Sequence, residues 1–148
     1  MATTLLEAPG TISLLPNVAR FLDQEHKLFI GGEWVTGSTG ERIIVIDPAT
    51  GREIGNVVAG SESDVNDAVA AARQAFHPAG PWRTMTLAER SKVIWGLADL
   101  LEQHREELAQ LESLDNGKPF HEALAIDVDS SVEMLRYFAG WATKIEGQ

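Results

Sequence analysis

The chain has 148 residues, about the length of one ordinary domain, and 44% of them are hydrophobic, as is typical of a globular protein. Its 22 acidic residues outnumber its 12 basic ones, and the formal net charge of −10 disfavours binding to nucleic acids and to anionic membrane surfaces. The sequence has no cysteine, which excludes disulfides and metal sites built from thiolates.

The N-terminal residues predict a loose tail without the features of a targeting segment. Residues 1–10 have no basic residue ahead of their short apolar pair, and the first arginine is Arg20, so neither a signal peptide nor a transit peptide is indicated. No apolar run in the sequence approaches the roughly 20 residues that span a bilayer. We therefore expect a cytoplasmic protein without a membrane partner.

Residues 13–24 carry apolar side chains at helical spacing and predict a short amphipathic helix. We place a domain boundary just after it. Residues 1–26 are then an N-terminal tail with a short helix, and residues 27–148 form the main body.

Two β-hairpins are predicted at the start of the main body. Each pairs two short runs of β-branched and aromatic residues around a turn that contains glycine. The first hairpin covers residues 27–35 with its turn at Gly31-Gly32, and the second covers residues 42–58 with the turn DPATG at residues 47–51.

A run of helices follows. Residues 61–64 (SESD) and 86–89 (TLAE) fit capping boxes, in which a hydroxyl and a carboxylate bond the free backbone amides at a helix start. A later helix is expected to end at Asn116-Gly117. Pro119 is expected to start another turn of helix, and a long helix to cover residues 128–143. The helix after residue 86 is expected to point one set of apolar residues inward: Val93, Ile94, Leu97, Leu100 and Leu101.

These elements carry more apolar faces than they can cover among themselves. A few strands followed by a run of helices is also not the alternating pattern of a complete doubly wound domain. We therefore expect the chain to be part of a larger structure. In isolation it should be marginally stable, aggregation-prone or molten.

Patterns that begin like metal sites lack the residues that those sites require. Residues 121–125 (HEALA) start like a zinc-protease helix, but Ala125 stands where the second histidine belongs. Residues 127–131 start like a calcium loop, but Val132 stands where that loop needs glycine. Glycine-rich dinucleotide and phosphate motifs are missing as well. These patterns therefore assign no catalytic and no cofactor-binding residue, although a Ser-His-Asp triad, defined by geometry, stays open.

Several segments resemble one enzyme family. Residues 112–119 (ESLDNGKP) resemble the "E-[ST]-L-D-N-G-K-P" segment in the N-terminal part of NAD(P)-dependent aldehyde dehydrogenases. Residues 28–34 resemble the first hairpin of that family, residues 47–51 its "[DN]-P-[AS]-T-G" turn, and residues 135–141 its "L-R-Y-[YF]-A-G-W" helix. The resemblance covers residues 28–148 and leans toward the betaine-aldehyde and phenylacetaldehyde dehydrogenase types.

The resemblance implies an α/β fold, the N-terminal part of the aldehyde dehydrogenase fold. The chain would supply an incomplete Rossmann-like cofactor domain, truncated before the catalytic domain. The complete enzyme would bind NAD or NADP, oxidise an aldehyde to a carboxylic acid through a cysteine thiolate, and form a homo-oligomer. Because the catalytic Cys and Glu and the dinucleotide site lie beyond the resembling part, we expect the segment to be inactive alone and to bind no cofactor.

The resemblance also assigns lesser roles to residues of this chain. Asp115, with the backbone carbonyls of Val45 and Ile46, matches a structural site for a monovalent cation. Three residues match family positions at the mouth of the substrate tunnel: Ile126, Asp127 and Ser130. Ser130 stands where some relatives have a larger apolar residue.

Two alternatives remain open at this point. The chain could be a short non-catalytic module that pairs with full-length subunits through its uncovered helix faces. It could also be an unrelated hydrolase built on its His and Asp residues, which has little support in the sequence.

Overall fold

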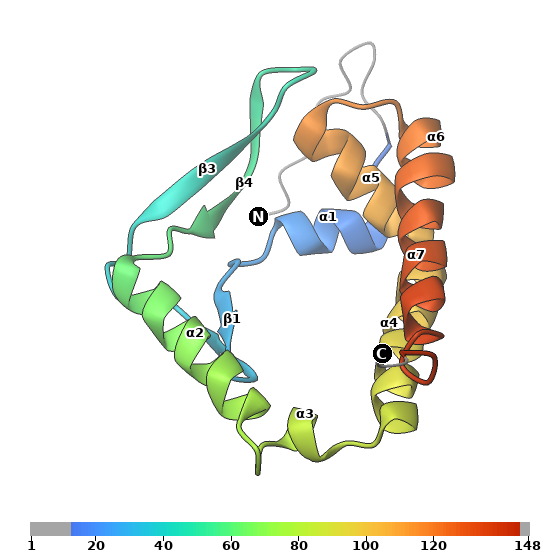
Figure 1. The fold of residues 1–148 in the computed structure, drawn as a ribbon. Coiled ribbons are helices and arrows are strands. Elements are labelled where there is room, and N and C mark those ends of the chain that lie inside the picture. Colours follow the sequence, from blue (N-terminus) through green and yellow to red (C-terminus); the bar gives the residue numbers. More distant parts are fainter. Residues whose placement is uncertain (1–12, 146–148) are drawn as a thin grey trace.

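The computed structural model describes residues 13–145, so the loose tail predicted for residues 1–10 lies outside the described part. Hairpins and helices follow one another around an open ring (Figure 1). This arrangement confirms the predicted α/β class. The elements in chain order are α1 (Pro16–Leu22), β1 (Leu28–Ile30), β2 (Glu33–Val35), β3 (Arg42–Asp47), β4 (Arg52–Val58), α2 (Glu62–Phe76), α3 (Pro81–Thr84), α4 (Leu87–Gln103), α5 (Arg105–Asn116), α6 (Phe120–Glu122), the π-helix η1 (Ala123–Val128) and α7 (Asp129–Ala139).

Both predicted hairpins are confirmed as two-stranded antiparallel sheets. In the first, Phe29 of β1 lies opposite Trp34 of β2. In the second, Val45 pairs with Gly55 and Ile46 pairs with Glu53, so the register shifts by one residue between the two pairs. This shift is a β-bulge, which interrupts the ladder of backbone hydrogen bonds.

Both predicted capping boxes form and begin α2 and α4. Ser61 Oγ accepts a hydrogen bond from the Asp64 amide at 3.2 Å, and Asp64 Oδ2 accepts one from the Ser61 amide at 2.8 Å. Thr86 and Glu89 repeat the arrangement at 3.2 and 2.7 Å. Local residue chemistry alone therefore determines where these two helices begin.

The turn of helix expected after Pro119 is present as α6, and α7 begins at Asp129, one residue after the predicted start of the long helix. The C-terminal bound is wrong, because α7 ends at Ala139 rather than at residue 143. The π-helix η1 joins α6 to α7 without a break. Proline suits a helix start because it has no backbone N–H group that would be left without a hydrogen-bond acceptor. At the other end, Gly140 follows the last helical residue, and glycine is a poor helix former.

The core is small. A buried cluster joins Ala109 of α5 to Ala123 and Val128 of η1. Ala98 of α4 and Val132 of α7 are buried as well. The prediction that the α4 face points inward is wrong for three of its five residues, which are about half exposed: Val93, Leu97 and Leu100. Helix α4 packs against α7 along another face.

The helix α1 is docked on α5 by its N-terminal end. The Leu15 amide donates to Gln110 Oε1 at 2.8 Å, and Gln110 Nε2 donates to the Ser13 carbonyl at 3.0 Å. Val18 is fully buried beside them. The domain boundary between residues 26 and 27 stays a prediction.

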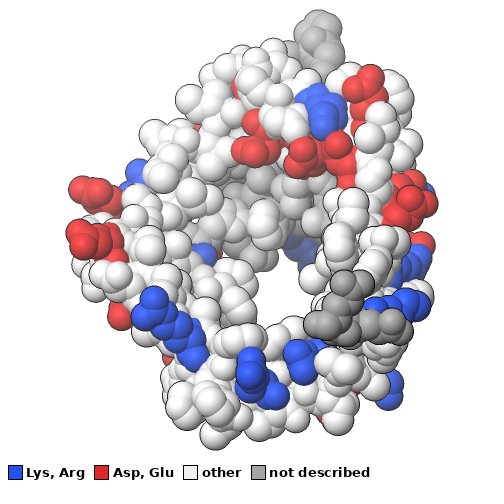
Figure 2. Space-filling view, viewed as in Figure 1, with Lys and Arg blue, Asp and Glu red and all other residues white. Residues whose placement is uncertain are grey.

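The ring encloses an opening between β1 on one side and α4 and α7 on the other (Figure 1). Side chains narrow this opening but do not close it (Figure 2). None of the helices within residues 13–145 is long and apolar enough to cross a membrane.

Candidate functional site

The turn after β3 meets the C-terminal end of α5, which brings together two of the segments singled out in the sequence. Gly117 ends α5 with a φ of +80°, and a Cβ atom built on it would lie only 2.9 Å from Cγ of Pro48. Glycine is needed at this position for both reasons, because it accepts the left-handed conformation and has no side chain to collide.

Hydrogen bonds fix the backbone that leaves α5. The Gly117 amide donates to the Ser113 carbonyl at 3.0 Å, and the buried Ser113 hydroxyl donates to the Lys118 carbonyl at 2.6 Å. The Lys118 amide in turn donates to Asn116 Oδ1 at 2.8 Å. The motif at residues 112–119 is therefore first of all a well-bonded helix end.

The opposing turn is bonded just as fully. Asp47 is buried, and its carboxylate accepts hydrogen bonds from the Ala49 amide at 2.8 Å and from the Thr50 hydroxyl at 2.7 Å. The Asp47 carbonyl accepts from the Gly51 amide at 2.8 Å. Asp47 therefore shapes the turn that Gly117 approaches.

The predicted cation ligands belong to these two neighbouring elements. Asp115 is exposed in the last turn of α5, while Val45 is half-buried and Ile46 exposed on β3, which packs against α5. The bulge in the second hairpin falls between Val45 and Ile46, where backbone groups leave the regular ladder. Residues 13–145 contain no cluster of three or more His, Asp or Glu side chains that could hold a metal ion.

The predicted tunnel residues lie on the π-helix and the first turn of α7. Ile126 is 58% exposed, Ser130 is exposed, and Asp127 is half-buried. The neighbours Ala123 and Val128 point into the core instead. Single π-helical turns often occur at functional sites, because the wider turn changes the direction of the side chains that follow.

An ion pair that sequence reasoning missed connects the two regions. Lys118 Nζ, after the α5 cap, donates to Asp127 Oδ2 on η1. This hydrogen bond raises the pKa of Lys118 above its ordinary value. At the start of α5, Arg105 donates to both carboxylate oxygens of Asp129 at 2.7 Å. The two pairs join the two ends of α5 to Asp127 and Asp129, where η1 passes into α7.

The described residues offer no assembled nucleophile. Cysteine is absent from the whole sequence, and within residues 13–145 none of the four histidines hydrogen-bonds a serine. His104 instead pairs with Glu107 at 3.3 Å. The geometry of a Ser-His-Asp triad, left open by the sequence, does not occur in this part of the chain.

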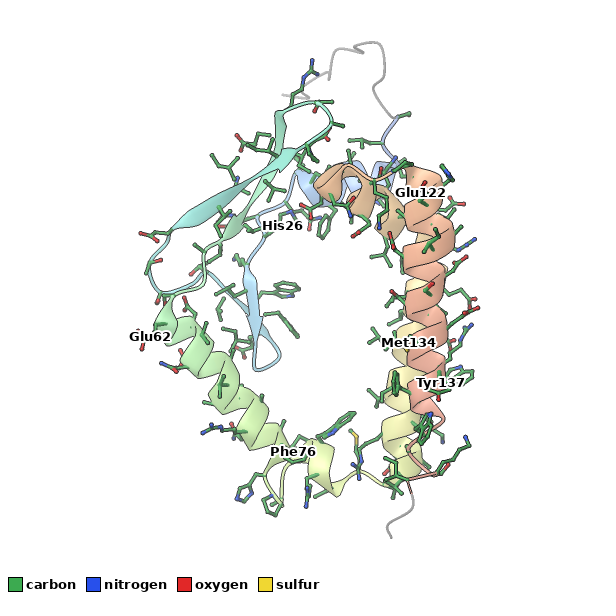
Figure 3. All side chains as sticks on the ribbon, turned by 45° about the horizontal axis from the view of Figure 1, so that its top comes forward. His26, Glu62, Phe76, Glu122, Met134 and Tyr137 are labelled. Atoms are coloured by element: carbon green, nitrogen blue, oxygen red, sulfur yellow. The ribbon has the colours of Figure 1, made fainter. Side chains whose placement is uncertain are left out.

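Large apolar side chains are exposed along both sides of the ring. Phe29 and Trp34 lie side by side on the first hairpin, with their ring centroids 4.9 Å apart and their planes tilted by 50°. Figure 3 places Phe76 at the end of α2 and Met134 and Tyr137 on α7, on the other side of the opening. All five are more than half exposed.

Comparison with known proteins shows which family has this arrangement of hydrogen-bonded turns and exposed apolar side chains. The sequence model described as the aldehyde dehydrogenase family matches residues 34–148. The chain belongs to the aldehyde dehydrogenase family. Aldehyde dehydrogenase 1A1 of Equus caballus is 46% identical over 143 residues, which are 97% of this chain and 28% of that protein.

Solved structures agree with the family match. The NAD+ complex of an aldehyde dehydrogenase from Bacillus cereus superposes with a TM-score of 0.89 at 52% identity, covering 93% of this chain and 28% of that one. A betaine aldehyde dehydrogenase from Staphylococcus aureus, also in complex with NAD+, superposes with a TM-score of 0.82 at 36% identity, over 88% of this chain and 26% of that one. The chain thus spans about 28% of the length of the curated relatives it matches.

Proposed function

We propose that this chain is the N-terminal segment of an NAD-dependent aldehyde dehydrogenase, an enzyme that oxidises an aldehyde to a carboxylic acid. The observation that supports it most is the superposition on the Bacillus cereus NAD+ complex at 52% identity over 93% of the chain. Identity of this extent over 93% of a chain reflects common ancestry, and the family match at residues 34–148 agrees with it.

The segment's proposed role is to frame the site rather than to perform the chemistry. The exposed Ile126 and Ser130 would form part of the mouth of the substrate tunnel, and Asp127 beside them is held by Lys118. Asp115 and the carbonyls of Val45 and Ile46 would bind a structural monovalent cation. The bulge between the last two residues and the packing of β3 on α5 support this assignment.

The chemistry of the family passes through a cysteine thiolate, and this chain has no cysteine. It also has no glycine-rich dinucleotide motif, so its residues do not fit the demands of an NAD site and we assign none of them to the cofactor. We therefore propose that the segment alone neither oxidises aldehydes nor binds NAD or NADP. The complete enzyme would use the cofactor, with an aldehyde as substrate and further copies of itself as oligomer partners.

The proposed location is the cytoplasm. The mouse relative is named a cytosolic aldehyde dehydrogenase, whereas an Arabidopsis thaliana relative is named mitochondrial. The name of the mouse relative is the observation that supports this assignment.

A hybrid enzyme, which we call the covalent graft, tests the function. In it, this chain replaces the matching N-terminal segment of the Bacillus cereus aldehyde dehydrogenase within one polypeptide, and aldehyde-dependent NADH formation is measured. We expect activity within about tenfold of the parent enzyme, because half of the aligned residues are identical and the backbones agree. The parent enzyme with its segment deleted is the control and should be inactive. A graft that is folded and monodisperse yet inactive would contradict the proposal.

A further inference from the structure

One asparagine of this chain stands directly before a glycine. Asn116 precedes Gly117, whereas the other asparagines precede valine or aspartate. Glycine has no side chain, so its backbone nitrogen can approach the preceding side chain more closely than the nitrogen of a larger residue can. The carboxamide of Asn116 is therefore the one in this sequence that is most open to attack by the next backbone nitrogen. The same pair of residues forms the end of α5.

Such an attack converts asparagine into aspartate and needs only water. The Gly117 nitrogen, after its proton has passed to water, bonds to Cγ of Asn116, and Nδ2 takes up a proton and leaves as ammonia. The product is a succinimide ring. Water then opens this ring at either of its carbonyl carbons, which gives aspartate or isoaspartate. No group is oxidised or reduced, so no further reactant is required.

The closed end of α5 holds the reacting groups away from one another. The Gly117 amide donates to the Ser113 carbonyl at 3.0 Å. The carboxamide of Asn116 is bonded at both ends, since Nδ2 donates to Glu112 Oε1 and Oδ1 accepts from the Lys118 amide at 2.8 Å. A helical N–H group also points along the helix axis toward the preceding turn rather than at the neighbouring side chain. The attack therefore requires these bonds to break.

The position of the pair in the fold lets this happen. Asn116 and Gly117 are exposed, and Asn116 is the last residue of α5. Helix ends open more often than helix interiors, because fewer bonds hold them. The buried Ser113 hydroxyl opposes opening through its bond to the Lys118 carbonyl at 2.6 Å. Opening frees the glycine amide and the asparagine carboxamide together.

We propose that Asn116 is a site of spontaneous deamidation, which proceeds through the open end of α5 and whose product weakens the contact between α5 and the turn after β3. The new carboxylate replaces the bond to Glu112 by repulsion, next to Asp115 and at the helix end where the dipole disfavours negative charge. Isoaspartate also adds a backbone carbon immediately before Gly117, which lies against Pro48. This inference goes beyond the proposed function and does not rest on it.

Peptide mapping by mass spectrometry tests the site. The covalent graft, folded in mildly alkaline buffer or unfolded in guanidinium chloride, is incubated, and conversion of Asn116 is followed with time. Asn66, an exposed asparagine of α2 that precedes aspartate, is the internal control. In the unfolded graft we expect Asn116 to react at least about tenfold faster than Asn66, because only Asn116 precedes glycine.

The folded graft, whose cooperative thermal melt is recorded first, tests the role of the helix end. We expect Asn116 to react at least about tenfold more slowly there than in the unfolded graft, because the reaction needs the rarely populated open state. Equal rates for Asn116 and Asn66 in the unfolded graft, or equal rates for Asn116 in the folded and unfolded grafts, would overturn the inference.

A matched pair of serine variants tests whether the end of α5 controls the rate. Ser113→Ala removes the hydroxyl that donates to the Lys118 carbonyl. Ser91→Ala removes one that donates to the Ala139 carbonyl, between α4 and α7. In the folded graft we expect Ser113→Ala to speed deamidation of Asn116 about fivefold and Ser91→Ala to leave it unchanged. Equal rates in the two variants would overturn control by this helix end.

Asn116→Asp reproduces the aspartate product and tests its effect. In unfolding of the graft by guanidinium chloride, we expect it to lower the folding equilibrium constant about fivefold, because it loses the bond to Glu112 and places a negative charge at the C-terminal end of a helix. Asn66→Asp adds the same charge to α2 and should change the constant far less. Equal changes in the two variants would overturn the proposed weakening of the contact at α5.

Discussion

Gly117 lies against Pro48, with only 2.9 Å between the position that a Cβ atom would take and Cγ of the proline. This contact joins the end of α5 to the turn between β3 and β4, two segments that are about 70 residues apart in the chain. Both segments belong to motifs that resemble the aldehyde dehydrogenase family, and in the fold the two motifs are in direct contact.

Replacing Gly117 by alanine should weaken this joint. The left-handed φ costs about 1 kcal/mol with any side chain, and displacement of Pro48 adds about 1 kcal/mol or more. Gly51→Ala is the matched control, because Gly51 also has a positive φ but nothing within 4 Å of its added Cβ. Urea unfolding of the covalent graft should show a larger loss of unfolding free energy for Gly117→Ala. Equal losses would mean that the contact with Pro48 contributes nothing.

The capping box at Ser61 gives a second prediction. Ser61→Ala removes the hydroxyl that accepts from the Asp64 amide and should lower the unfolding free energy of the graft by about 1 kcal/mol. Ser63→Ala, two residues further in the same helical turn and exposed, should change it far less. If the two variants are equally stable, the capping bond does not hold α2.

Asp64 makes the stability pH-dependent. Hydrogen bonds from the backbone and then the side chain of Ser61 lower the pKa of the Asp64 carboxyl below 3.8. A lowered pKa stabilises the folded state above pH 3.8, and this contribution disappears as the pH falls through the folded-state pKa. Asp64→Asn should therefore reduce stability near neutral pH, and the two proteins should converge in acid. A difference that is constant with pH would show that the charge plays no part.

The isolated chain should behave as an incomplete fold. Its exposed apolar stripes should bind the dye ANS, and thermal unfolding followed by circular dichroism should be broad. Val69→Asp places a charge on the exposed apolar stripe of α2 and should therefore reduce ANS binding. Ala70→Asp places a charge on the polar side of the same helix and should reduce it less. A monodisperse monomer with a sharp cooperative melt and no ANS binding would contradict this.

Ser130 should control the width of the substrate tunnel in the complete enzyme. In the covalent graft, Ser130→Met fills space on the exposed side of α7 and should raise KM for long-chain aldehydes about tenfold, with little effect on short ones. Ser130→Ala leaves the space unchanged and should match the parent. An equal effect of Ser130→Met on short and long aldehydes would place Ser130 outside the tunnel.

The features that could be predicted from the sequence are the helix starts and turns, because residues close together in the chain determine them. Ser61 with Asp64, Thr86 with Glu89, and Gly31-Gly32 each specify a helix start or a turn within a few positions, and all of them are confirmed. The glycine end of α5 at Gly117 belongs to the same class.

What could not be predicted depends on long-range packing. The π-helix at Ala123–Val128 has no local signature, and it arises where Ala123 and Val128 must both reach α5. The pair between Lys118 and Asp127 depends on that same widened turn. Val93 and Leu97 form a correct apolar stripe on α4, but periodicity cannot tell whether the partner of a stripe lies within the chain.

The most direct test of the central claim is the intact mass of the native protein in the cells that make it, captured with an antibody against this chain. A segment of an aldehyde dehydrogenase should be part of a polypeptide several times heavier than the 16.1 kDa of this chain, since it spans about 28% of its relatives. A native mass near 16.1 kDa would contradict that claim and would make the chain a separate protein.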